Sequence, residues 1–167
     1  METREAHALV PFLNALQYLV LALWVGSLFG FGALFAPVLF AALPARERAG
    51  AIAGTALARI DVLGLVAGGI MLVVTVLQAI DGGWQAIDLG RLLIAALMLA
   101  LVILSATSVR QRLTAAKAQM SQPIDAYDPD DPLRQEYNRH HRTSRALFTL
   151  NLVLGALLIV LSALRPQ

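Results

Sequence analysis

The stretch from Leu9 to Leu43 contains no aspartate, glutamate, lysine, arginine or histidine, and its one ionisable side chain is that of Tyr18. About 20 consecutive apolar residues are enough for a helix to cross the hydrocarbon core of a bilayer, so this stretch is longer than one crossing needs. Hydrophobic residues make up 58% of the chain and charged residues 14%, whereas a soluble domain carries about 25% charged residues. We therefore predict an integral membrane protein.

Composition excludes several other classes of protein. Cysteine is absent, which rules out disulfides, thiolate metal ligands and a cysteine nucleophile. Glu2 and Glu5 outweigh Arg4, and the apolar stretch that follows is longer than the core of about 7–15 residues in a signal peptide. We expect this first segment to stay in the mature protein. The basic residues lack the aromatic–basic pattern of nucleic-acid binding, so we expect a lipid bilayer as partner and no nucleic acid.

Four apolar segments are predicted to span the membrane, at about residues 12–40, 60–80, 89–109 and 146–164. The first exceeds the ~30 Å hydrocarbon core at ~1.5 Å per residue, so it must tilt, kink at Pro37, or end there. Residues 110–145 form the polar segment, and Asp131 before Pro132 is a favourable helix start. We predict a single all-α integral membrane domain over residues 1–167. It is a four-helix transmembrane bundle, up-down-up-down, with cytoplasmic extensions of helices two, three and four.

Basic residues predict the orientation, because cytoplasmic loops are enriched in lysine and arginine. One side of the four spans holds Arg4, Arg91 and Arg165. The other holds Arg46, Arg48, Arg59, Arg110, Arg112, Lys117, Arg134, Arg139, Arg142 and Arg145. We therefore expect residues 44–58 and 110–145 to face the cytoplasm and both termini to lie outside, in a plasma membrane of the bacterial inner-membrane type.

Small residues recur four apart on the first two predicted spans, at Gly26 and Gly30 and at Gly64 and Gly68. Such G-x-x-x-G pairs let helix backbones approach closely in lipid. We favour packing within the chain, with a homo-oligomer or another membrane partner as the alternative.

Asp61 is the clearest intramembrane ionisable residue, and such residues are functional candidates because a charge in hydrocarbon is costly. Arg59, two positions away, points to a different face. We expect a better partner from the fourth helix, where Arg142, Ser144 and Arg145 reach the same depth. Two interpretations stay open: an ion pair that fixes the register of helices two and four, or a carboxylate linked to a proton or substrate.

A polar stripe follows one face of the fourth helix, through His141, Ser144, Phe148, Asn151 and Gly155. Neighbouring residues on a helix point ~100° apart, so His140 and His141 cannot easily ligate one ion together. A b-type haem usually takes histidine as axial ligand, and the remaining histidine, His7, lies on the opposite side. We expect no metal and no cofactor. The candidate buried polar site consists of Asp61, His141, Ser144, Asn151, Arg59 and Arg145.

A second polar face lies on the first helix, where Asn14, Gln17, Leu21 and Trp24 share one side. This face either lines a small pocket open to the outside or satisfies polar groups of the other helices.

Three segments resemble a known family. They are LALWVGSLFGFGALFAPVLFAALP, AGAIAGTALARID, and a terminal H-R-x-S-x-x-x-x-x-x-N that contains His141, Ser144 and Asn151. Together they resemble the "domain of unknown function 4149" family, which is similar to transmembrane protein 205. The resemblance implies a four-helix membrane protein, loosely associated with metal or drug resistance.

Two other four-helix families fit less well. The outline is similar to that of HemJ-type protoporphyrinogen oxidase, but that resemblance requires a histidine early in the first helix, where this chain has Gln17. The sequence is also similar in outline to copper-resistance D-type membrane proteins. This chain, however, lacks the methionine and histidine density that copper handling favours.

The leading hypothesis is a non-enzymatic membrane protein that handles a small solute or ion, or serves as an accessory membrane subunit. One alternative is a haem- or quinone-dependent, HemJ-like membrane oxidoreductase. Another is a lipid-binding scaffold whose basic collar, Arg139 to Arg145, binds anionic headgroups.

Overall fold

The computed structural model describes residues 2–165, with side chains from Pro11 onward, so the side chains of Arg4 and His7 lie outside the described part. The elements are α1 (Glu2–Phe29), η1 (Gly30–Phe35), α2 (Ala36–Ala42), α3 (Arg46–Gly82), α4 (Ala86–Leu104), η2 (Ser105–Val109), α5 (Arg110–Ala118), η3 (Ile124–Ala126) and α6 (Pro132–Ala163). Here η1 and η2 are π-helical turns and η3 is a 3₁₀ turn.

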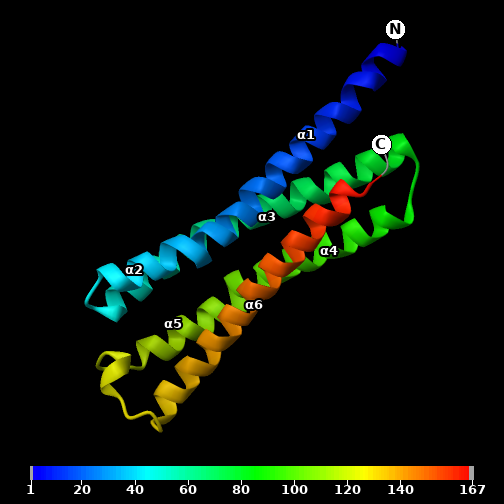
Figure 1. The fold of residues 1–167 in the computed structure, drawn as a ribbon. Helices are drawn as coiled ribbons and strands as arrows, with labels where there is room; N and C mark the ends of the chain where they lie inside the picture. The colour runs from blue at the N-terminus through cyan, green and yellow to red at the C-terminus, as the bar shows by residue number, and fades with distance from the viewer. Residues whose placement is uncertain (1, 166–167) are drawn as a thin grey trace.

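The long helices form an antiparallel bundle (Figure 1). α1 packs against α3 and α6, and α4 packs against the same two helices, so the four form a ring. Among the described residues, four helical stretches are long and apolar enough to cross a membrane: Pro11–Ala42, Arg46–Gly82, Ala86–Ala118 and Pro132–Ala163. The predicted all-α bundle of four candidate membrane spans is confirmed.

The helices extend further than the apolar segments. The first continues past Pro37 to Ala42, because the wider π-turn η1 precedes the proline and Pro37 falls in the first turn of α2. A π-turn accommodates a break in the regular hydrogen-bond ladder. The last helix begins at Pro132, where the Asp131 carboxylate accepts a hydrogen bond from the Leu133 N–H at 2.8 Å. The predicted cap is therefore confirmed.

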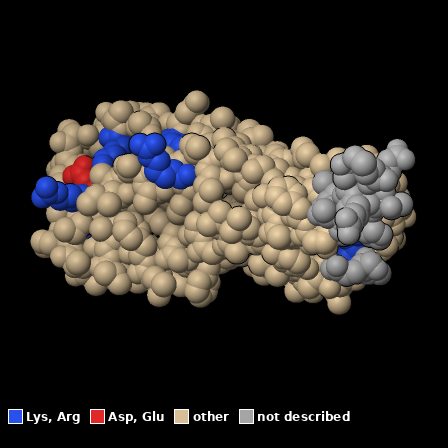
Figure 2. Space-filling view, turned by 90° about the horizontal axis from the view of Figure 1, so that it is seen from above, with Lys and Arg blue, Asp and Glu red and all other residues tan. Residues whose placement is uncertain are grey.

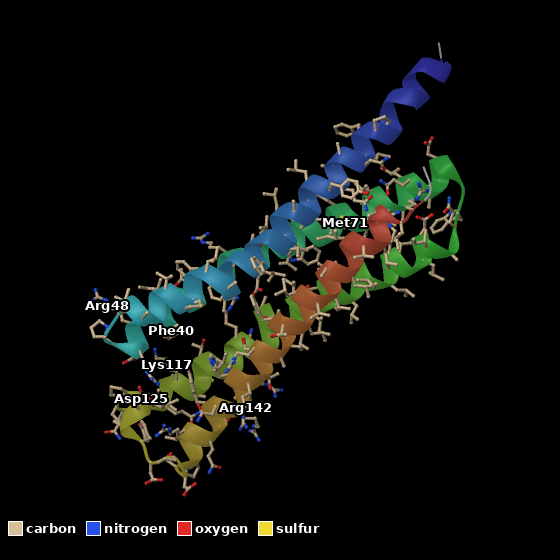
Figure 3. The ribbon with its side chains drawn as sticks, in the orientation of Figure 1. Phe40, Arg48, Met71, Lys117, Asp125 and Arg142 are labelled. Carbon is tan, nitrogen blue, oxygen red and sulfur yellow. The ribbon has the colours of Figure 1, made fainter. Side chains whose placement is uncertain are left out.

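The core runs along the centre of the ring and is built from all four spans. Its buried members are Val20, Leu21, Trp24, Leu28, Ala67, Met71, Ala95, Met98, Val102 and Leu158. Figure 3 shows Met71 among the helices. Large apolar side chains also cover the outside of the bundle, among them Leu23, Leu34, Val66, Leu93, Val153 and Val160. A soluble monomer rarely exposes so much contiguous apolar surface, so the candidate spans imply contact with a lipid bilayer.

The small residues divide into two groups. A Cβ atom at Gly64 would lie 2.8 Å from the Trp24 indole nitrogen, and one at Gly68 would lie 2.9 Å from Leu99 Cδ1. Both glycines therefore let α3 approach its neighbours closely. At Gly26 and Gly30, by contrast, no described atom lies within 4 Å of an added Cβ, so these two face away from the bundle.

The two ends of the bundle differ in character. We call the end with the α3–α4 turn (residues 83–85) the turn end, and the opposite end, with residues 43–45 and 119–131, the loop end. Figure 3 shows Arg48, Lys117, Asp125 and Arg142 at the loop end. There the ammonium group of Lys117 lies 3.1 Å from the Glu47 carboxylate, which links α5 to the start of α3.

Candidate functional site

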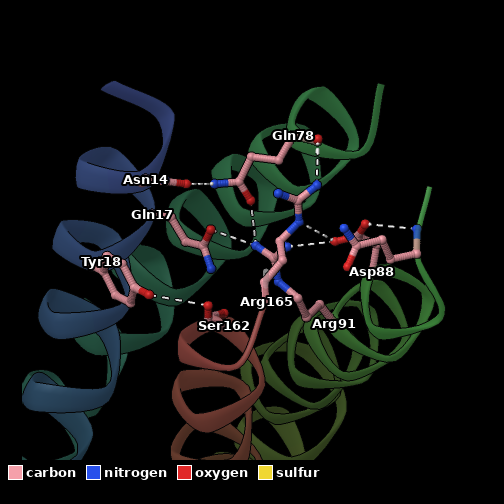
Figure 4. A network of polar contacts seen from close by, with 9 residues as sticks. Asn14, Gln17, Tyr18, Gln78, Asp88, Arg91, Ser162 and Arg165 are labelled. Carbon is pink, nitrogen blue, oxygen red and sulfur yellow. Dashed lines mark hydrogen bonds and ion pairs between the residues drawn. The ribbon is translucent and has the colours of Figure 1, made fainter. Parts of the chain in front are cut away.

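A network of buried polar side chains joins all four spans at the turn end (Figure 4). We call it the turn-end cluster, and it consists of Asn14, Gln17, Gln78, Asp88, Arg91 and Arg165. At its centre the Arg91 side chain is 0% exposed and donates to Asp88 Oδ1 at 2.8 Å. The same guanidinium group donates to Gln17 Oε1 at 2.6 Å and to Gln78 Oε1 at 2.5 Å. Arg91 on α4 therefore links this helix to both α1 and α3 by hydrogen bonds.

The local sequence around the α3–α4 turn determines where Asp88 and Arg91 lie. Gly83 has a φ of 77°, a left-handed conformation that glycine adopts without a Cβ penalty. Gln85 then caps α4, and the Asp88 carboxylate accepts from the Gln85 N–H at 3.2 Å in a capping box. Since residues three apart share a helix face, Asp88 and Arg91 both point into the bundle.

Arg165 completes the cluster from the end of α6. Its Nε donates to Asp88 Oδ1 at 2.9 Å, and its Nη2 donates to the Gln78 carbonyl at 2.7 Å. The guanidinium group lies over Gly82, where an added Cβ would be 3.1 Å from Nη2. The Tyr18 hydroxyl donates to the Ser162 carbonyl at 3.2 Å and ties α1 to the same end of α6.

The cluster carries more positive than negative charge. Asp88 accepts from both Arg91 and Arg165, so one carboxylate serves two guanidinium groups. Two buried donors, Arg91 Nε and Gln17 Nε2, have no partner among the described residues. Burying a charge or a donor without a partner costs free energy. The arrangement can therefore accept a further anionic or hydrogen-bond-accepting group.

The polar face predicted on the first helix does point inward. Gln17, Leu21 and Trp24 are buried, and Asn14 accepts a hydrogen bond from Gln78 Nε2 at 2.8 Å. Of the two interpretations, satisfaction of polar groups on other helices is the one these contacts support. The Trp24 side chain is 0% exposed, and its indole N–H has no hydrogen-bond partner among the described residues.

At the loop end, Asp61 pairs with Arg110 at the start of α5. The expected partner on the fourth helix is wrong, because the hydrogen bond and ion pair that Asp61 makes among the described residues are with Arg110. The ion pair therefore fixes α3 against α5 and not against α6. Arg59 and Arg145 are exposed.

The stripe on α6 enters the bundle as its spacing predicts. His141 is exposed and stacks on Tyr137, with ring centroids 6.1 Å apart; Ser144 is half-buried and Asn151 is buried. The Asn151 amide donates to the Met98 carbonyl on α4 at 3.3 Å, which is an interhelical hydrogen bond. The described contacts do not bring this stripe to Asp61, and a functional role for the predicted set stays a prediction. Within residues 11–165, no group of three or more potential metal ligands converges.

The sequence reasoning missed Asp88, Gln78 and the buried role of the two turn-end arginines. The third span was predicted to begin at Leu89, which left Asp88 outside the membrane. Two signals were available: the D-x-x-R spacing, which places both charges on one helix face, and Gln85 three residues before Asp88, which marks a helix start.

Comparison with known proteins places the chain in a family. No curated protein and no solved structure shows a significant match. The family model described as "Domain of unknown function (DUF4149)" matches residues 19–122, which cover most of the first three spans. The α6 motif with His141, Ser144 and Asn151 lies beyond the matched range. Because the match covers more than half of the 167 residues, this chain, with its four candidate transmembrane helices in the described residues, belongs to the DUF4149 family.

Proposed function

We propose that this protein handles a small anionic solute, which it binds at the turn-end cluster without a chemical step. The observation that carries the proposal is the shared carboxylate: Arg91 and Arg165 both donate to Asp88 Oδ1, at 2.8 and 2.9 Å. A small anion such as chloride or a carboxylate supplies the second negative charge. Its acceptor atoms suit guanidinium donors, which bind carboxylates through charge-assisted hydrogen bonds.

Arg165 is the member of the cluster that can admit the anion. Its side chain is 11% exposed, whereas those of Asp88 and Arg91 are 0% exposed. It also follows the last turn of α6 and is not held within the helix. When an anion binds the Arg165 guanidinium group and draws it outward, Asp88 is left to pair with Arg91 alone. Each charge then has one partner, and the bundle core keeps its contacts.

Anion dependence of stability tests this proposal. Purified protein in detergent is melted at constant ionic strength while sodium gluconate is replaced by sodium formate or chloride. At ten times the dissociation constant, a bound anion stabilises the folded state by about 1.4 kcal/mol. Trp24 is buried and Trp84 is exposed, so tryptophan fluorescence can follow unfolding.

The matched variants are Arg165→Gln and Arg145→Gln. Arg165→Gln leaves one carboxylate and one guanidinium group in the cluster and is expected to abolish the response to formate and chloride. Arg145→Gln removes an exposed arginine at the loop end and is expected to keep the response. A parent protein indifferent to both anions, or an Arg165→Gln variant that responds as the parent does, would contradict the proposal.

We further propose that the turn end faces outside and the loop end faces the cytoplasm. The distribution of basic residues supports this orientation, because the two arginines of the turn-end cluster share the Asp88 carboxylate. Most of the Lys and Arg side chains visible in Figure 2 lie on its left, at the loop end. Cytoplasmic ends of membrane proteins carry such excess.

Single-cysteine labelling tests the orientation, since the chain has no cysteine of its own. Trp84→Cys is expected to react with an impermeant maleimide in intact cells, because Trp84 is exposed at the turn end. Lys117→Cys, exposed at the loop end, is expected to react only after the membrane is permeabilised. The reverse pattern would invert the proposed topology.

A further inference from the structure

A polar pocket of about 250 Å³ lies between α5 and α6 at the loop end. Its polar lining comes from Arg112 and Gln119 on the α5 side and from Glu136, Arg139 and His140 on α6. It is separate from the turn-end cluster, at the other end of the bundle, so an inference about it does not depend on anion binding there; it rests on the proposed function only for the orientation of the bundle in the membrane.

The lining of this pocket has two guanidinium groups and one carboxylate, an excess of positive charge that suits an anion. Glu136 supplies the one carboxylate of the lining, and His140 Nε2 lies 3.7 Å from it. The guanidinium groups of Arg112 and Arg139 have no hydrogen-bond or ion-pair partner among the described residues. Two arginines from two helices therefore face one open pocket with their donors unused.

The depth of the pocket identifies where such an anion would come from. From Arg91 to Arg110 the chain rises about 30 Å at ~1.5 Å per residue, which is the thickness of the hydrocarbon core. If the turn-end cluster marks one boundary, Arg110 marks the other, and Arg112 then lies ~3 Å beyond it. Arg139 lies at a similar level on α6, because Asn151 bonds to Met98 and the two arginines lie 12 and 14 residues from this contact, which is ~18 and ~21 Å toward the loop end. The headgroup region occupies the first ~5–8 Å outside the hydrocarbon, so the pocket opens at the level of lipid phosphates.

We propose that Arg112 and Arg139 bind the phosphate group of an anionic phospholipid. A guanidinium group binds phosphate oxygens in a bidentate manner, and basic pockets between membrane helices on the cytoplasmic side hold anionic headgroups. Arg142, which is exposed on the next turn of α6, adds positive charge beside the pocket. The lipid would bridge α5 and α6 at the point where they leave the membrane.

Lipid counting tests the site. The protein is reconstituted in nanodiscs of equal phosphatidylglycerol and phosphatidylcholine, and the lipids that remain bound after detergent extraction are counted by native mass spectrometry. We expect phosphatidylglycerol to be retained over phosphatidylcholine by the parent protein. The double variant Arg112→Gln, Arg139→Gln is expected to lose this retention at least tenfold. Both arginines are exposed, and circular dichroism verifies that the variant is folded.

The control is the double variant Arg48→Gln, Arg59→Gln. It removes the same charge from exposed positions on α3 that do not line this pocket, and it is expected to retain phosphatidylglycerol within twofold of the parent. If both double variants lost phosphatidylglycerol equally, the proposed site would be wrong, because the overall positive charge of the protein would then explain the retention of this lipid. Displacement of the lipid by millimolar inorganic phosphate would overturn the assignment to a lipid and indicate a soluble phosphate ligand.

Discussion

Replacing Asp88 with asparagine is expected to lower the free energy of unfolding by about 3–5 kcal/mol, the usual cost of removing one partner from a buried ion pair. The reason is that Arg91 and Arg165 would both remain in the bundle without a carboxylate, and Arg91 is 0% exposed. The Gln85 N–H would also lose its charged acceptor. The measurement is unfolding by sodium dodecyl sulfate in mixed micelles, followed by circular dichroism.

Asp81→Asn provides the matched control. Asp81 is an exposed carboxylate at the same end of α3, and surface substitutions usually change stability by less than about 0.5 kcal/mol. Adding Arg165→Gln to Asp88→Asn removes one of the two unpaired charges. The double variant should therefore be less destabilised than the sum of its single changes, by roughly 0.5–3 kcal/mol. Equal effects of Asp88→Asn and Asp81→Asn would show that the buried ion pair does not hold the bundle together.

The bundle itself follows from hydropathy, because backbone groups in lipid must be satisfied within a helix. The helical extensions beyond the apolar segments were also predicted. The 46–59 stretch and the 110–118 stretch are helical although they are only weakly apolar or polar, as expected for extensions of the second and third helices. The clear stops are local: Pro44 in the first loop, Gly83 with its positive φ, and Asp131 as a side-chain cap.

The partner of a buried polar side chain was harder to predict than the helix face on which that side chain lies. The spacing along one helix gives the face on which a side chain lies, and it placed Asn151 and Gln17 correctly inside the bundle. It does not give the rotation and register of the neighbouring helix. The sequence placed Arg145 at the depth of Asp61, and the packing of α3 against α4 and η2 brings Arg110 to it instead.

The turn-end cluster shows a second limit of sequence reasoning. Arginines near the ends of apolar segments usually serve as charged boundaries in the headgroup region, and Arg91 and Arg165 were interpreted in that way. Their burial depends on amides supplied by other helices, since Gln17 and Gln78 accept from Arg91. The burial of Arg91 becomes apparent only when Gln17, Gln78 and Asp88 are known to contact it, and these four residues lie on three helices. The pattern within a single helix does not show contacts between helices.

Replacing Gly64 with leucine is expected to destabilise the protein by about 3 kcal/mol, at the upper end of the usual cost of overpacking a core. An added Cβ would lie 2.8 Å from Trp24 Nε1 and 3.2 Å from Val102 Cγ2. Trp24 is 0% exposed and Val102 is 3% exposed, so neither side chain can move into solvent or lipid. The helices α1, α3 and α4 would have to separate at the centre of the core. The same detergent unfolding assay measures the loss.

Gly69→Leu is the control on the same helix, one turn further along. No described atom lies within 4 Å of an added Cβ at Gly69, and leucine has a higher helix propensity than glycine by roughly 0.5–1 kcal/mol. This variant should therefore be as stable as the parent or slightly more stable. The two substitutions change helix propensity equally, so a difference between their effects on the free energy of unfolding reports on packing alone. If Gly64→Leu and Gly69→Leu were equally stable, Trp24 would not be packed against α3, and the close approach of α1 and α3 would be wrong.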